Sequence, residues 1–141
     1  MKNYSDLQDI SRLIPVSICI EPVGQPCVDI IINDNVVDYR PLNNSVTYTE
    51  FVDLLTTISI SVLLSKKTYT QEYETAVIIK KLSVDNIDLI PNYDYLADYQ
   101  NDHNNNNPTS YVGFNGKWTL TIDRPFYQWL HQVQGHGWLL T

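Results

Sequence analysis

The chain has 141 residues, enough for one domain with its own hydrophobic core and too few for two full domains. Hydrophobic residues make up 43% of the chain, which fits a folded globular protein and excludes general disorder. The formal net charge of -7 disfavours nucleic acid and anionic membrane surfaces as partners, because both repel an acidic protein.

Residues 1–15 are polar and mixed in charge, and they predict an N-terminal arm, extended or as a short helix, that ends at Pro15. The first ten residues have no apolar stretch of the kind found in signal peptides, so no secretory signal is expected. No apolar run in the chain approaches the roughly 20 residues that a membrane-spanning helix requires. We therefore expect no membrane span.

Short β-strands dominate the rest of the chain, because apolar and polar residues alternate in short runs, most clearly in TISISVLL at 57–64. Turn signals separate the runs: a hairpin is predicted around Asn33-Asp34-Asn35 and a tight turn at Asp85-Asn86, and Asn115-Gly116 is the strongest signal of all. That dipeptide predicts a hairpin that joins 111–114 to 117–122. In chain order, the predicted strands are 16–20, 28–32, 36–39, 46–55, 57–64, 75–84, 87–90, 111–114 and 117–122. The pattern predicts a mainly β fold, an antiparallel β-sandwich or barrel-like domain with one short C-terminal helix.

The helix is predicted over Pro125 to Gln134. Proline suits its first position, and Gly135 can end it. The apolar residues at helical spacing that would face the core are Phe126, Trp129, Leu130 and Val133. We expect residues 16–141 to form a single β-rich domain after the arm.

A long loop rich in asparagine and aspartate is predicted at about 91–108. Between Leu82 and Gly116 there is no Lys or Arg. Carboxylate and amide oxygens suit Ca²⁺, but the spacing matches no EF-hand loop. The stretch is therefore interpreted as a solvated loop, and no metal site or cofactor is predicted.

Cys19 and Cys27 flank a segment with turn residues at both ends. Two interpretations stay open: free buried thiols, or sulfurs brought close if the flanking segments pair as strands. Their spacing predicts no zinc site.

Tyr93, Tyr95 and Tyr99 lie close to Asp94 in the predicted loop. Aromatic rings with nearby carboxylates suit sugar binding, since a ring stacks on a pyranose while oxygens bond its hydroxyls. Tyrosines are equally suited to a protein interface or to the edge of a β-sandwich core. These three interpretations remain open.

Catalytic motifs are absent from the sequence. No serine stands in a nucleophile elbow, and the three histidines have no metal-ligand spacing. The protein is therefore predicted not to be an enzyme.

Three motifs near the C-terminus occur in order: Asn115 to Leu120 (NGKWTL), Asp123 to Trp129 (DRPFYQW) and Gly137 to Leu140 (GWLL). The segment 113–140 that contains them resembles the C-terminal pattern of small β-rich structural proteins of tailed bacteriophages. The resemblance implies a phage-encoded protein that resides in the virion after synthesis in the host cytoplasm. It implies no catalytic residue.

Two functions are predicted from these observations. The leading prediction is a non-enzymatic virion structural component, such as a capsid decoration, neck or tail accessory protein. It would be oligomeric and assemble with other virion proteins. Its interface residues would be Trp138, Leu139, Leu140 and Tyr127.

The alternative is a carbohydrate-binding β-sandwich module, assisted by calcium or not. Its glycan-binding residues would be Tyr93, Tyr95, Tyr99 and Asp94.

Overall fold

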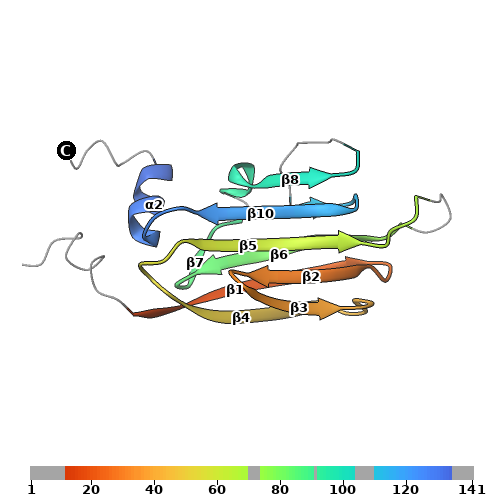
Figure 1. Cartoon of the computed structure of the whole chain (residues 1–141), viewed down its shortest axis with the longest axis horizontal. Coiled ribbons are helices and arrows are strands. Elements are labelled where there is room, and N and C mark those ends of the chain that lie inside the picture. Colours follow the sequence, from red (N-terminus) through yellow and green to blue (C-terminus); the bar gives the residue numbers. More distant parts are fainter. Residues whose placement is uncertain (1–11, 70–73, 91, 104–109, 135–141) are drawn as a thin grey trace, which may run out of the picture.

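Two antiparallel β-sheets face each other in the computed structural model, which describes residues 12–69, 74–90, 92–103 and 110–134 (Figure 1). Sheet A has the order β4 (Val46–Asp53), β1 (Leu13–Val23), β6 (Ala76–Val84), β7 (Ile87–Asp88), and β9 (Tyr111–Val112) also pairs with β6. Sheet B has the order β3 (Asn35–Tyr39), β2 (Cys27–Ile32), β5 (Ile58–Ser65), β10 (Gly116–Ile122), β8 (Asp98–Asn101). A 3₁₀ turn, η1 (Asp94–Leu96), precedes β8, and α2 (Phe126–Val133) follows β10. The predicted mainly β sandwich with one short C-terminal helix is confirmed.

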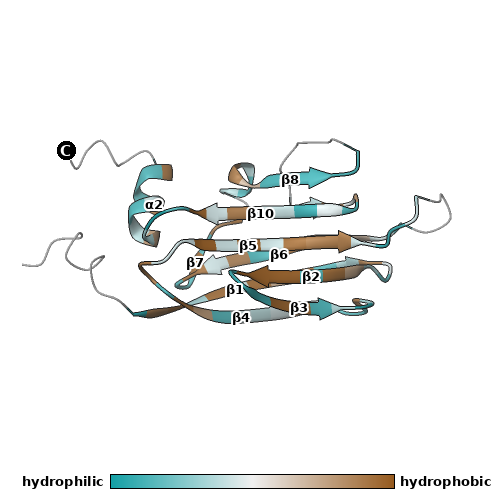
Figure 2. Ribbon diagram, in the orientation of Figure 1, coloured by the Kyte–Doolittle hydropathy of each residue, from teal (hydrophilic) through white to brown (hydrophobic). Residues whose placement is uncertain are grey.

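The core lies between the sheets, because alternate residues of each strand point inward. Trp118 at the centre of β10 has no exposed surface, and hydrophobic residues are concentrated in the central strands while β8 is hydrophilic (Figure 2). The fully buried residues of β1 and β5 that face each other's sheet are Ile14, Val16, Ile18, Ile20, Ile58, Ile60 and Val62. Burial of this apolar surface is the main stabilising term of the fold.

Most predicted strands are confirmed, and so are two of the predicted turns. Strands β2 and β3 form a hairpin around Asn33, which has a φ of 53°. Asp85 and Asn86 join β6 to β7 with φ of 50° and 65°, as a two-residue type I′ turn requires. Strand β1 begins at Leu13, so the last residues of the predicted arm belong to sheet A, and residues 1–11 lie outside the described part of the chain.

The predicted hairpin around Asn115-Gly116 is wrong. Strand β9 pairs with β6 in sheet A, whereas β10 pairs with β5 and β8 in sheet B. The connection therefore crosses from one sheet to the other. Part of the predicted loop at 91–108 forms regular structure as well, since it contains η1 and β8, and residues 91 and 104–108 of it are not described.

The two cysteines lie on the outer faces of different sheets. Cys19 stands between the buried Ile18 and Ile20 of β1, so its side chain points away from the core. Cys27 precedes the buried Val28 of β2 and points outward from sheet B. Both thiols are free, and the interpretation that brought the two sulfurs together is wrong.

Helix α2 closes one end of the sandwich (Figure 1) and buries Trp129 and Leu130 against it. The Tyr127 hydroxyl donates to the Asp85 carboxylate, which also accepts a 2.8 Å hydrogen bond from Arg12. Burial and the bond to Asp85 raise the pKa of Tyr127 to about 12. Tyr127, predicted at a partner interface, therefore binds its own chain, and residues 138–140 of that predicted interface lie outside the described residues.

Gly116 has no room for a side chain. A Cβ there would lie against the Gln100 carbonyl oxygen and 2.6 Å from Asn101 Cα, both backbone atoms of the neighbouring strand β8. We expect Gly116→Ala to lower the free energy of unfolding by about 1–3 kcal/mol, as overpacking does, measured by urea denaturation. The control is Gly113→Ala, whose Cβ would meet only the Tyr111 ring at 2.7 Å, and that ring is 44% exposed and can move. Equal unfolding free energies for the two variants would contradict the close approach of β8.

Candidate functional site

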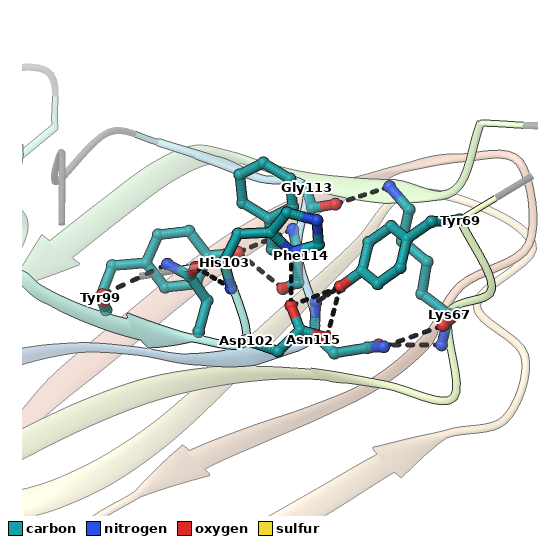
Figure 3. A network of polar contacts seen from close by, with 9 residues as sticks. Lys67, Tyr69, Tyr99, Asp102, His103, Gly113, Phe114 and Asn115 are labelled. Atoms are coloured by element: carbon teal, nitrogen blue, oxygen red, sulfur yellow. Dashed lines mark hydrogen bonds and ion pairs between the residues drawn. The ribbon is translucent and has the colours of Figure 1, made fainter. Parts of the chain in front are cut away.

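Three strand ends meet at the end of sheet B that lies opposite α2 (Figure 1). The antiparallel order β5–β10–β8 brings the C-terminal ends of β5 and β8 to the N-terminal end of β10. Side chains from these three places form a polar and aromatic network (Figure 3). We call this network the end cluster, and its members are Lys67, Tyr69, Asp102, His103, Phe114 and Asn115.

Asn115 holds the end cluster to the end of β5. Its side-chain oxygen accepts a hydrogen bond from the Lys67 backbone N–H at 2.8 Å, and its side-chain amide donates to the Lys67 carbonyl at 2.9 Å. The Asn115 backbone N–H donates to the Tyr69 hydroxyl at 2.8 Å. The side chain thus extends the β5–β10 pairing beyond its last residues and fixes the position of Tyr69.

Asp102 is the acidic centre of the end cluster. The Tyr69 hydroxyl lies 2.6 Å from Asp102 Oδ1 and 2.8 Å from Oδ2, and His103 Nδ1 lies 2.8 Å from Oδ1. The side chains of Asp102 and His103 are 45% and 44% exposed. The carboxylate is therefore oriented by its neighbours and still accessible to a ligand, since it can accept about four hydrogen bonds.

Three aromatic rings pack around this carboxylate (Figure 3). The His103 ring stacks on Phe114 with centroids 4.2 Å apart, and Tyr69 meets the His103 ring edge-on at 4.5 Å. Tyr69 is 46% exposed, so the cluster presents aromatic surface to solvent. The Lys67 ammonium lies 5.5 Å from the Tyr69 ring centroid, a cation–π contact that steadies this ring.

Tyr99 holds the Phe114 segment of the end cluster in place from the buried side of β8. Its hydroxyl donates to the Phe114 carbonyl at 2.6 Å and accepts from the Phe114 N–H at 2.9 Å. Only 4% of Tyr99 is exposed. This tyrosine fixes the backbone that carries Phe114 and cannot offer its own ring to a ligand.

The four residues predicted to bind sugar do not form one surface. Tyr99 is buried, and Tyr93 is half-buried with its ring edge-on to Trp129 at 6.0 Å. Tyr95 is 57% exposed on η1, which also carries Asp94. The prediction is wrong for Tyr99, because the strand alternation of β8 turns this residue inward.

Sequence reasoning missed most of the end cluster. Tyr69 and Asp102 are 33 positions apart, and Tyr69 and Asn115 are 46 apart, so no local motif joins them. The one available signal was Asn115, which stood in the turn between two predicted strands, whereas Asp102 lay in the predicted loop. That signal becomes informative only when the strand order is known.

Hydrogen bonds shift the titration of the end cluster. The bonds from Tyr69 and His103 lower the pKa of Asp102 below its ordinary value. Partial burial and the bond to Asp102 raise the pKa of Tyr69. A lowered carboxyl pKa means that the contribution of Asp102 to stability is present above about pH 3.9, its unfolded value. That contribution is lost as the pH falls through the folded pKa.

No protein-family model matches the sequence, and no curated protein matches it. Two solved structures share the fold, and both are described as the carbohydrate-binding module vCBM60. One is the selenomethionine form, described in connection with "two families of calcium-dependent carbohydrate binding modules". Its TM-score with this chain is 0.52 at 13% identity, and the match covers 75% of this chain and 88% of that chain. The other is vCBM60 "in complex with galactobiose", with a TM-score of 0.51, 11% identity, and coverage of 77% and 99%.

The predicted role as a virion structural component is corrected by this comparison. The two solved structures named above are described as carbohydrate-binding modules, and neither is described as a virion protein. The comparison favours the alternative prediction of a carbohydrate-binding β-sandwich. It does not bear on the resemblance of residues 113–140 to phage proteins, which stays a prediction.

The Tyr69 hydroxyl should control the pKa of Asp102. In Tyr69→Phe we expect the Asp102 pKa to rise toward about 3.9, because the largest cause of its lowering is removed. Carboxyl carbon shifts followed by NMR during a pH titration measure this change. Asp123 is the internal control, since its pKa is lowered by Arg124 instead and should not move. An unchanged Asp102 pKa would show that the hydroxyl does not bind the carboxylate in solution.

Proposed function

We propose that this protein is a carbohydrate-binding module and that the end cluster is its binding site. The observation that carries the proposal is the grouping of exposed aromatic rings with an oriented, accessible carboxylate at one end of a β-sandwich. The shared fold of two carbohydrate-binding modules supports it. The protein would bind its ligand without chemical conversion.

The groups of the end cluster match the chemistry of a sugar. A pyranose offers an apolar face to an aromatic ring and hydroxyl groups to polar atoms around that ring. The exposed Tyr69 ring supplies the first kind of contact, and the Asp102 carboxylate accepts hydrogen bonds from hydroxyls. When His103 Nδ1–H points at Asp102, its neutral ring leaves Nε2 as a further acceptor. The end cluster can therefore contact one face of a sugar ring through Tyr69 and the hydroxyls at its edge through Asp102 and His103.

Calcium does not fit the end cluster. Within the four described stretches of the chain, no group of three or more His, Cys, Asp or Glu side chains is placed to hold a metal ion. Asp102 is the one carboxylate among the six residues of the end cluster, and Asp94 and Asp98 belong to η1 and β8. The proposed sugar contacts are therefore made by side chains directly.

Glycan binding should depend on Tyr69. Affinity electrophoresis in gels containing soluble galactan, xylan, mannan or β-glucan should show retardation by at least one polysaccharide. Galactan is included because one solved neighbour binds galactobiose. If the ring contact is worth about 1.4 kcal/mol, Tyr69→Ala should weaken binding by about tenfold.

The matched control is Phe51→Ala, which removes a 60% exposed aromatic residue from β4 of sheet A. Its retardation should equal that of the parent protein. Retardation by none of the polysaccharides would refute the proposed function. Equal losses in the Tyr69 and Phe51 variants would refute the placement of the site.

Removal of calcium should leave binding intact. In the same gels, an excess of EDTA should not change the retardation, because the contacts proposed for the end cluster need no metal ion. Millimolar Ca²⁺ should leave the melting temperature unchanged for the same reason, since a ligand stabilises only the state it binds. A loss of retardation in EDTA, restored by Ca²⁺ and not by Mg²⁺, would show that a metal ion participates.

A further inference from the structure

A polar groove crosses the outer face of sheet B beside the end cluster. The alternation of β8 and β10 buries Tyr99, Trp118 and Leu120 and turns the intervening residues outward. These outward residues line an open groove of about 260 Å³: Asp98, Gln100, Lys117, Thr119 and Thr121. Gln100 and Lys117 stand opposite each other, one residue from the strand ends that form the end cluster.

The groove continues from β10 toward α2. Thr121 also lines a second hollow of about 240 Å³, whose other walls include Leu96, Arg124 and Trp129. The two hollows therefore share Thr121 as a lining residue. β10 runs from the end of sheet B that carries the end cluster to the end that carries α2 (Figure 1), and the two hollows lie along this path.

The lining of this path suits a neutral chain with many hydroxyl groups. It combines carboxylate, amide, ammonium and hydroxyl groups, so it offers both hydrogen-bond donors and acceptors. The charges balance, because Asp98 and Asp123 offset Lys117 and Arg124. A nucleic acid would require a net positive lining instead.

The groove is longer than one sugar ring. From Lys117 to Thr121, β10 advances roughly 13 Å at about 3.3 Å per residue. A single sugar held at Tyr69 and Asp102 would leave the groups of the groove without a ligand. Only a chain of several units reaches from the end cluster to Thr121.

We propose that the groove over β8 and β10 extends the site, so that the protein binds an oligosaccharide of several units along the outer face of sheet B. This inference rests on the proposed function and adds the form of its ligand. The end cluster holds one unit against its aromatic rings. Gln100 and Thr121 bond the hydroxyls of the units that follow.

Chain length is the measurement that separates the groove from the end cluster. Isothermal titration calorimetry would compare the disaccharide with the hexasaccharide of galactan, xylan, mannan and β-glucan. For the series that binds, the hexasaccharide should bind about tenfold tighter, the gain expected from one to three neutral hydrogen bonds. The double variant Gln100→Ala, Thr121→Ala should reduce this gain to near zero and leave the disaccharide affinity unchanged.

The control is Thr47→Ala, an exposed threonine on β4 of the other sheet, which should keep both affinities. Far-UV circular dichroism and melting temperature verify that each variant is folded. The proposed groove would be refuted if the disaccharide and the hexasaccharide bound with equal affinity in every series that binds. It would also be refuted if the double variant kept the higher affinity for the hexasaccharide. In either case retardation by a polysaccharide would still support the end cluster. Binding in none of the series would overturn the groove as well, and the gel experiment then decides whether the proposed function fails with it.

Discussion

Strand β10 is paired on both sides, with β5 and with β8, and this double pairing determines the rest of sheet B. Its register places Gly116 opposite Leu64 on one side and Asn101 on the other. A shift by one residue would turn Trp118 out of the core and bring Lys117 into it. The same register sets Asn115 beside the end of β5. Core, groove and end cluster therefore depend on one hydrogen-bond ladder.

Side chains continue that ladder where the backbone pairing stops. The Asn115 amide makes two hydrogen bonds with the Lys67 backbone, and the Tyr99 hydroxyl makes two with the Phe114 backbone. These bonds immobilise Tyr69 and Phe114 before any ligand arrives. A site whose rings are already held in place loses less conformational entropy on binding. The end cluster is thus suited to recognition of a rigid, hydroxyl-rich ligand.

The two ends of the sandwich differ in how much aromatic surface they expose. Helix α2 covers one end with Trp129 and Leu130, which are almost fully buried. At the opposite end, Tyr69 and His103 keep nearly half of their surface exposed. The exposed aromatic rings of the end cluster stand beside an oriented carboxylate, unlike single exposed side chains such as Phe51, and this grouping supports the proposed binding site. Outward-facing polar groups of β8 and β10 lie between the two ends, and the proposed extension of the site rests on them.

The sequence by itself determined most of the strands, the tight turn at Asp85-Asn86 and helix α2, because alternation, turn chemistry and helical spacing are local properties. Strand β8 is the exception, since it lies in the stretch predicted to be a loop. The sequence also supported the sandwich as a class. Only the tertiary structure decided the partners of β9 and β10, since pairing with three strands of two sheets outweighs the local preference of Asn115-Gly116 for a hairpin. It also decided that Tyr99 is buried and that Tyr69 belongs to the site. Residues so far apart in sequence meet only through strand order, which no local pattern encodes.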